Sequence, residues 1–316
     1  MFVSDLPELK LNKSGELATG FAFQFKLLAK RNFLNMIRLP QTSYVKAMTT
    51  IATALFACLL FFQVPHTAEG IQNIQGALFF VCMNTVLNAV QNVILIFPEE
   101  RPCFLREVNN NMYGPSPYFW AKITSELPFS LMQPVIFGSI VYFVIGLNSV
   151  NASFFFTFML IVILTYNAAQ GYALVISAGF SDKQLAVTLT PVLIIPFMLF
   201  AGFFASTSSI PIELVIFQYL SIFMYAYNAL LLNQFEIFVN DPTVDYGSQG
   251  FPCITDNSCA PLSQITHSYT VTNSTGTFTE SKHPDMWTMI GGLSAIYVIF
   301  YSSAWLILVL LARKVE

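Results

Sequence analysis

Charged residues are scarce in this sequence. The chain has 316 residues, of which only 10% are Asp, Glu, Lys or Arg, whereas soluble domains average about 25%. So few charges cannot cover the surface of a soluble enzyme of this size, and a hydrophobic content of 55% excludes intrinsic disorder. The net charge of −3 does not indicate a nucleic-acid partner. The composition therefore predicts an all-α polytopic membrane protein whose main partner is the lipid bilayer.

Motifs for catalysis and metal binding are also missing. The sequence contains no GxxxxGK[ST] phosphate loop, no HExxH and no GxSxG. The three histidines, His66, His267 and His283, do not have the spacing of metal ligands. We therefore expect no catalytic residue, no metal site and no bound cofactor in this chain.

Long apolar stretches are what the sequence does contain. A helix crosses the hydrocarbon core in about 20 apolar residues. Six stretches qualify, at residues 44–62, 77–97, 119–147, 153–178, 185–205 and 286–312. A seventh, 212–232, is interrupted by Glu213 and Gln218, and we interpret it as a re-entrant or interfacial helix pair.

The basic residues predict the orientation of these spans. With six spans and both termini in the cytosol, Lys282 is the only one of the 14 Lys and Arg residues that falls outside. This asymmetry is the positive-inside pattern of multi-pass proteins. A seven-span topology would place Arg313 and Lys314 outside. We therefore expect an integral protein of the plasma membrane or an endomembrane, with both ends cytosolic.

The large loop 233–285 is then external and carries two cysteines. Cys253 and Cys259 would face an oxidising space, where an intrachain disulfide is favoured over free thiols or a bridge to a second subunit. Asn273 begins an Asn-Ser-Thr sequon and is a candidate glycan acceptor. Cys58 and Cys82 lie in spans, and we expect them to be free thiols.

Two segments outside the spans carry most of the charge. Residues 1–19 read as a polar tail, and 20–42 as a basic amphipathic helix in the cytosolic interface, ended by Pro40, or else as a simple stop before the first span. Residues 98–117 hold the densest cluster of charges: Glu100, Arg101, Arg106 and Glu107. This segment is either a helix through which a soluble partner acts or a solvated connector.

Polar residues follow one face of the second span. Asn84, Asn88, Gln91 and Asn92 fall at i, i+4, i+7 and i+8. Amides are costly in lipid, so this face must look into the bundle or a wet cavity. It is either a pathway or dimer-facing wall, which we favour, or a set of interhelical hydrogen bonds. Lys122 and Glu126, in the third span, are expected to form a local ion pair.

The fifth span ends in two adjacent phenylalanines. Pro191 and Pro196 permit the span to bend, and Phe203 and Phe204 follow Gly202 at its outer end. A hydrophobic constriction of this kind can gate a path by dewetting. Ordinary core packing is the alternative in a chain with 32 phenylalanines.

In their order along the chain, several of these segments resemble the White-type, G-subfamily ABC transporters. Residues 25–40 resemble the elbow helix of that family, and Glu100-Arg101 with Arg106-Glu107 resembles its connecting helix. Tyr118-Phe119, Glu126-Leu127-Pro128 and Pro134 resemble its third span. Gly202-Phe203-Phe204 and Asn233-Gln234-Phe235 resemble its fifth span and the re-entrant helices. The resemblance covers residues 20–316, which it identifies as one G-type transmembrane domain.

The resemblance implies a homo- or heterodimer of six-span domains around a central cavity. Its wall would hold Asn84, Thr85, Asn88 and Gln91 from the second span, with Val192, Ile195 and Met198 from the fifth. Phe203 and Phe204 would form the two-residue plug. Some members have an aromatic clamp where this chain has Asn88, so the wall is more polar here.

The same resemblance implies an ATP-binding domain, whose motifs this sequence does not contain. Family members carry an ATP-binding domain, which supplies the sites for ATP and Mg²⁺ and acts in cis or in trans. The chain is then a membrane-domain fragment, a truncated product or half of a split transporter. We expect the translocating part of an ATP-driven exporter of lipids, sterols or amphipathic molecules. A non-transporting scaffold and, less favoured, a passive channel are the alternatives.

Overall fold

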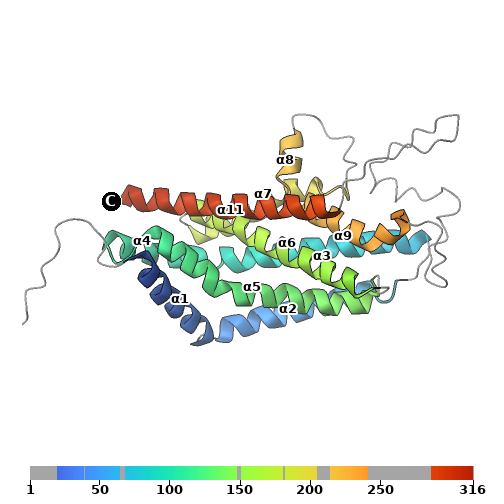
Figure 1. The fold of residues 1–316 in the computed structure, drawn as a ribbon, viewed down its shortest axis with the longest axis horizontal. Coiled ribbons are helices and arrows are strands. Elements are labelled where there is room, and N and C mark those ends of the chain that lie inside the picture. The colour runs from blue at the N-terminus through green and yellow to red at the C-terminus, as the bar shows by residue number, and fades with distance from the viewer. Residues whose placement is uncertain are drawn as a thin grey trace, which may run out of the picture.

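The described residues of the computed structural model form an all-helical bundle (Figure 1). The described ranges are 20–38, 40–64, 68–147, 151–180, 182–204, 214–240 and 286–315. The helices are α1 (Phe21–Arg38), α2 (Pro40–Leu60), α3 (Ala68–Ile94), α4 (Phe97–Asn109), α5 (Pro115–Ile145), α6 (Ala152–Gly179), α7 (Lys183–Leu199), α8 (Val215–Tyr219), α9 (Ile222–Asn240) and α11 (Met286–Val315). Cys253, Cys259 and Asn273, and with them the predicted disulfide and glycan, lie outside the described residues.

Helix α6 is the centre of the bundle and packs against α3, α5, α9 and α11 (Figure 1). Its buried face contains small residues such as Ala168, Ala169 and Gly171. A Cβ added at Gly171 would lie 2.7 Å from the Tyr301 ring of α11. Small residues allow this close approach of backbones, which is how helices associate where no water drives them together.

Four helical stretches are long and apolar enough to cross a membrane: Gln72–Asn109, Pro115–Ile145, Ala152–Gly179 and Met286–Arg313. They contain the expected second, fourth and sixth spans and nearly all of the expected third, which ends two residues later at 147. The expected first and fifth spans are the shorter apolar helices Tyr44–Leu60 and Lys183–Leu199. The prediction of an all-α polytopic fold is confirmed, whereas length and apolarity alone support four of its six spans.

Several boundaries differ from those expected. Pro40, which we expected to end an amphipathic helix over 20–42, is instead the first residue of α2, a position where the missing amide proton of proline costs nothing. The charged segment 98–117 is divided, because Gly114 and Pro115 start α5. The stretch 212–232 contains two helices, α8 and α9, and α9 continues to Asn240, beyond the expected loop start at 233.

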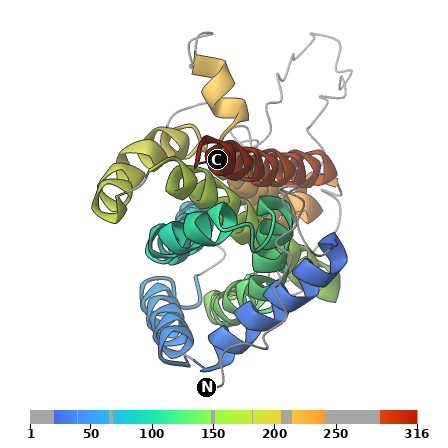
Figure 2. The ribbon, with the colours of Figure 1, turned by 90° about the vertical axis from the view of Figure 1, so that its left-hand side faces the viewer.

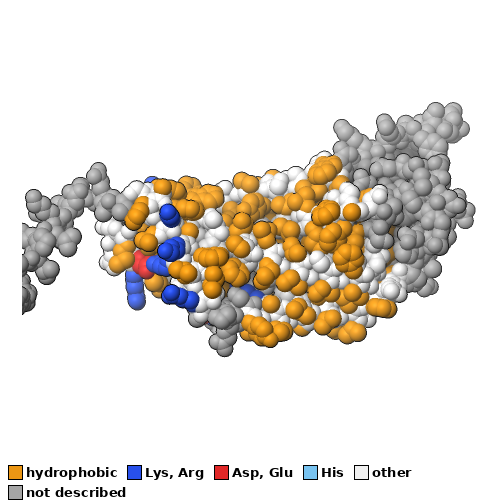
Figure 3. All heavy atoms as spheres, turned by 60° about the horizontal axis from the view of Figure 1, so that its bottom comes forward, with side chains coloured by type: hydrophobic (Ala, Val, Ile, Leu, Met, Phe, Trp, Pro, Cys, Tyr) orange, Lys and Arg blue, Asp and Glu red, His pale blue; other side chains and the backbone are white. Residues whose placement is uncertain are grey.

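Helix α1 lies obliquely across one end of the bundle and packs against α5 (Figure 2). It buries Gln24 and Leu28, and the Gln24 Oε1 accepts a hydrogen bond from the Gly114 amide at 3.1 Å. Its exposed surface mixes apolar rings with lysines, as expected of an interfacial helix. Most Lys and Arg side chains seen in Figure 3 gather at this end, and the rest of that face is largely apolar.

Candidate functional site: a charged junction and a polar helix face

Helix α4 is joined by ion pairs to three other helices. Arg31 of α1 lies 3.2 Å from Glu107 Oε2, Lys122 of α5 pairs with Glu100, and Lys183 of α7 pairs with Glu99. Glu99 and Glu100 lie in the first turn of α4, where the positive end of the helix dipole favours acidic residues. We call this cluster, with Tyr113 and Glu126, the charged junction. It connects the interfacial helix α1 to the bundle.

The contact between α1 and α4 also involves a tyrosine. Both Tyr113, through its hydroxyl, and Arg31 donate hydrogen bonds to the Glu107 carboxylate. Burial lowers the pKa of the Arg31 guanidinium, but the hydrogen bond and charge of Glu107 outweigh burial and raise this pKa overall. Burial, followed by the bond to Glu107, raises the pKa of the Tyr113 hydroxyl. Both groups therefore keep their protons and stay donors at any physiological pH.

Lys122 is buried between two carboxylates. Its side chain is 9% exposed, and Nζ lies 2.7 Å from Glu126 Oε1, which confirms the expected local pair. Its second partner, Glu100, comes from another helix and has no periodic relation to Lys122 in the sequence. Since a buried ammonium is costly without partners, this pairing holds α4 against the start of α5.

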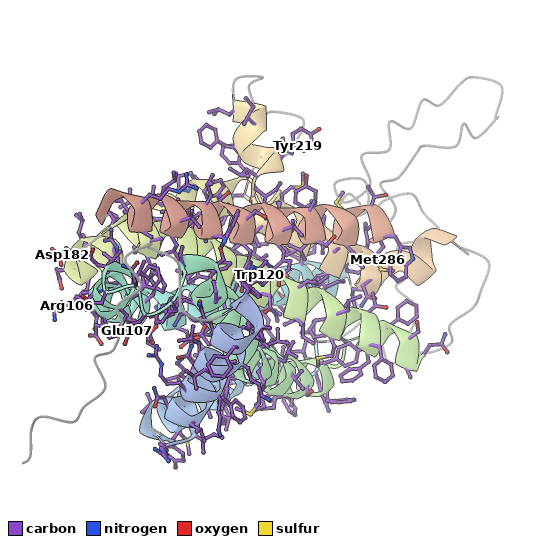
Figure 4. The ribbon with its side chains drawn as sticks, turned by 60° about the vertical axis from the view of Figure 1, so that its left-hand side comes forward. Arg106, Glu107, Trp120, Asp182, Tyr219 and Met286 are labelled. Atoms are coloured by element: carbon purple, nitrogen blue, oxygen red, sulfur yellow. The ribbon has the colours of Figure 1, made fainter. Side chains whose placement is uncertain are left out.

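The other predicted contact residues of α4 differ in exposure. Arg101 is buried, whereas Arg106 is exposed. Figure 4 shows Arg106, Glu107 and Asp182 at one end of the molecule, away from Met286 at the start of α11. Arg106 is therefore exposed at the basic end. Whether these residues contact an ATP-binding domain stays a prediction.

The polar face of α3 divides into two groups. Asn88 Nδ2 donates to Asn84 Oδ1 at 3.0 Å, both residues are half-buried, and Gln91 is exposed. Asn84 Nδ2 is buried and has no hydrogen-bond partner within the described residues. Thr85 is buried inside the protomer, and its hydroxyl donates to the Val81 carbonyl at 2.7 Å.

Asn92 belongs to an interhelical hydrogen-bond network. Its Nδ2 donates to Gln133 Oε1 of α5 at 2.8 Å and to the Tyr166 hydroxyl of α6 at 2.9 Å, and Tyr166 bonds to Gln133 as well. For this residue the alternative of interhelical hydrogen bonds is therefore the correct one. The sequence contains no signal for this network, because Gln133 and Tyr166 lie in other spans and no helical spacing relates them to Asn92.

Helix α7, which packs beside α3, presents an apolar surface. The exposed fraction is 61% for Val192 and 49% for Ile195, and Met198 is half-buried. Exposure within one protomer is compatible with a cavity wall or a dimer face. Their role as substrate contacts stays a prediction.

The phenylalanines after α7 take part in an aromatic cluster. The Phe203 ring stacks on Phe79 of α3 with centroids 4.5 Å apart, and Phe204 meets the same ring edge-on at 5.2 Å. Tyr227 of α9 lies 6.0 Å from Phe203, centroid to centroid. Gly202 allows the turn into this cluster with a φ of 90°, which favours glycine. Both side chains remain partly exposed in the protomer, Phe203 at 40% and Phe204 at 57%.

Comparisons with known proteins agree with this architecture. Residues 23–235 match the family described as ABC-2 type transporter. The chain is 32% identical over 299 residues to Protein white of Drosophila melanogaster, covering 95% of this chain and 41% of that protein. It is 32% identical over 219 residues to the broad substrate specificity ATP-binding cassette transporter ABCG2 of Bos taurus, covering 69% of this chain and 33% of that protein.

The chain thus spans less than half the length of these relatives. A third relative, the ABC transporter ATP-binding protein/permease wht-1 of Caenorhabditis elegans, is 32% identical over 222 residues. The match to the family covers more than half of the chain, from the first turn of α1 to most of α9. The chain is therefore a multi-pass membrane domain that belongs to the ABC-2 type transporter family and is related to the White and ABCG transporters.

Proposed function

We propose that this chain forms the substrate pathway of an ATP-driven exporter. Two copies, or one copy and a related domain, would face each other across α3 and α7. ATP-binding domains, in cis or in trans, would act on the basic end of the bundle, which we place in the cytosol. The observation that carries the proposal is the charged junction. Its ion pairs join α4 to α1, α5 and α7, so a displacement of α4 can be transmitted to all three helices.

The wall of the proposed pathway favours amphipathic cargo. Val192 and Ile195 are apolar, while Asn84 and Asn88 supply amide groups on the neighbouring helix. A mostly apolar surface with a few polar groups suits a lipid, a sterol or an amphipathic small molecule. Substrate would enter from the cytosol or inner leaflet and leave past Phe203 and Phe204.

The test separates ATP hydrolysis from transport. In the full-length protein reconstituted in liposomes, we expect Arg106→Ala to retain ATPase activity but to lose most ATP-dependent transport of an amphipathic dye. Arg106 is exposed, so the fold should be unaffected. Ser302→Ala, an exposed position on α11, is the control and should match the wild type. Wild-type transport in Arg106→Ala would argue against the proposal that ATP-binding domains act on the bundle through α4.

A further inference from the structure

A cavity of about 210 Å³ lies inside a single protomer, next to the charged junction. Among its lining residues are Asn35 of α1, Lys46 of α2, Asn92 of α3, Phe129 of α5 and Tyr166 of α6. None of its lining residues comes from α7 or α9, and none is a proposed wall residue of α3, so the cavity is distinct from the proposed pathway wall. Its volume is below the ~300 Å³ at which sites for drug-sized molecules begin, and it therefore suits a smaller polar group.

Lys46 supplies a cation to this cavity. The residue is half-buried, and within the described part of the chain its ammonium group makes neither a hydrogen bond nor an ion pair. The charges of Glu126 and Glu100 attract this ammonium, but neither carboxylate lies within ion-pair distance of it, so its donors remain available to an anionic ligand. Lys46 is thus the natural contact for a phosphate.

The cavity is also lined by two carboxylates. Glu100 and Glu126 both line it, and they share the single ammonium of Lys122. Together with Lys46, the four charges sum to zero, and Lys46 makes no ion pair with either carboxylate. A ligand with one anionic and one cationic group would match both kinds of charge, whereas a simple anion would be repelled by the carboxylates.

The surroundings of the cavity are apolar on the outside. Met132 lines the cavity and is 42% exposed, and Val45 and Met48, on either side of Lys46, are also exposed. The cavity therefore reaches a surface that hydrocarbon can cover. An amphiphile could place its polar head inside and leave its chains in the bilayer.

We propose that this cavity binds the headgroup of a phospholipid that carries both a phosphate and an ammonium group, as in phosphatidylethanolamine. The phosphate contacts Lys46, the ammonium lies beside Glu100 and Glu126, and the acyl chains leave past Met132. The site does not depend on the proposed export function, because it lies within one protomer and needs neither ATP nor cargo.

Native mass spectrometry of the purified full-length protein tests the site. We expect one dioleoyl phosphatidylethanolamine per chain to stay bound to the wild type. Lys46→Met should weaken retention about tenfold, the loss of roughly one charge-assisted contact. Lys46→Arg should retain the lipid. Lys30→Met, which removes the same charge from an exposed position on α1 outside the cavity, should bind as the wild type does.

Two further binding measurements identify the headgroup and test whether the site takes a lipid or a soluble ligand. Dioleoyl phosphatidylglycerol, which has the phosphate but no ammonium, should bind more weakly than phosphatidylethanolamine. Soluble glycerophosphoethanolamine should displace the lipid only at millimolar concentration; displacement at micromolar concentration would assign the same site to a soluble ligand. The lipid should raise the melting temperature of the wild type more than that of Lys46→Met. Equal retention by the wild type and Lys46→Met, or tighter binding of phosphatidylglycerol, would overturn the proposal.

Discussion

Two adjacent glycines in α11 have different surroundings. A Cβ added at Gly292 would lie 2.3 Å from the Tyr225 ring of α9, while nothing lies within 4 Å of one added at Gly291. Gly292 therefore allows α9 and α11 to pack closely, and Gly291 does not serve that contact.

We predict that Gly292→Ala destabilises the protein by about 1–3 kcal/mol, the usual cost of inserting a methyl group into a packed interface. Gly291→Ala should be neutral or stabilising by up to ~1 kcal/mol, because alanine is the better helix former. Thermal unfolding of the two variants in detergent compares them directly. Equal melting temperatures would show that α9 and α11 do not pack as described.

Side chains on one helix face need not share a role, as α3 shows. The spacing of Asn84, Asn88 and Asn92 predicted a common polar face, and these residues do lie on α3. Asn92 is nevertheless satisfied by Gln133 and Tyr166, whereas Asn84 and Asn88 bond to each other. Periodicity gives the face of a helix but not its neighbours, so the sequence could not separate the two roles.

Among the helices, α4 is where the sequence was most informative. Its dense charges were apparent from the sequence, and the pair of Lys122 with Glu126 on the neighbouring helix α5 followed from helical spacing. The partners Arg31 and Lys183 could not be predicted, because 76 and 84 residues separate them from Glu107 and Glu99. Such pairs depend on how the helices cross, which neither charge nor periodicity specifies.

A double-mutant cycle tests the contact between α1 and α4. The side chains of Arg31 and Glu107 are 43% and 22% exposed, so their pair should contribute no more than about 0.2–1 kcal/mol to stability. We therefore expect Arg31→Gln and Glu107→Gln to unfold near the wild-type temperature but to reduce the ratio of transport to ATP hydrolysis, with non-additive effects in the double variant. Additive effects would indicate that the two residues act independently.

For the whole molecule, the described helices support a bundle with one basic end and an aromatic cluster around Phe203. The family and the multi-pass architecture follow from residue patterns spread over most of the chain. The arrangement of two copies does not, since the contacts between protomers lie outside the structure of one.

The aromatic cluster yields a prediction about transport. In the full-length protein, Phe203→Ala combined with Phe204→Ala should change the transport rate or the retention of substrate, because it removes the two rings that contact Phe79. Initial rates of ATP-dependent uptake into inside-out vesicles measure this effect. Kinetics identical to the wild type would indicate that the two rings serve only core packing.

The central claim is that transport passes between the α3–α7 faces of two membrane domains. The most direct measurement is a cross-link at Val192, which is 61% exposed on α7. In a full-length protein without other reactive cysteines, Val192→Cys should form dimers on mild oxidation, lose ATP-dependent transport, and recover it on reduction. Val298→Cys, 57% exposed on α11, is the matched control. Cross-linking at Val298 but not at Val192, or undiminished transport in the cross-linked Val192→Cys dimer, would contradict the account.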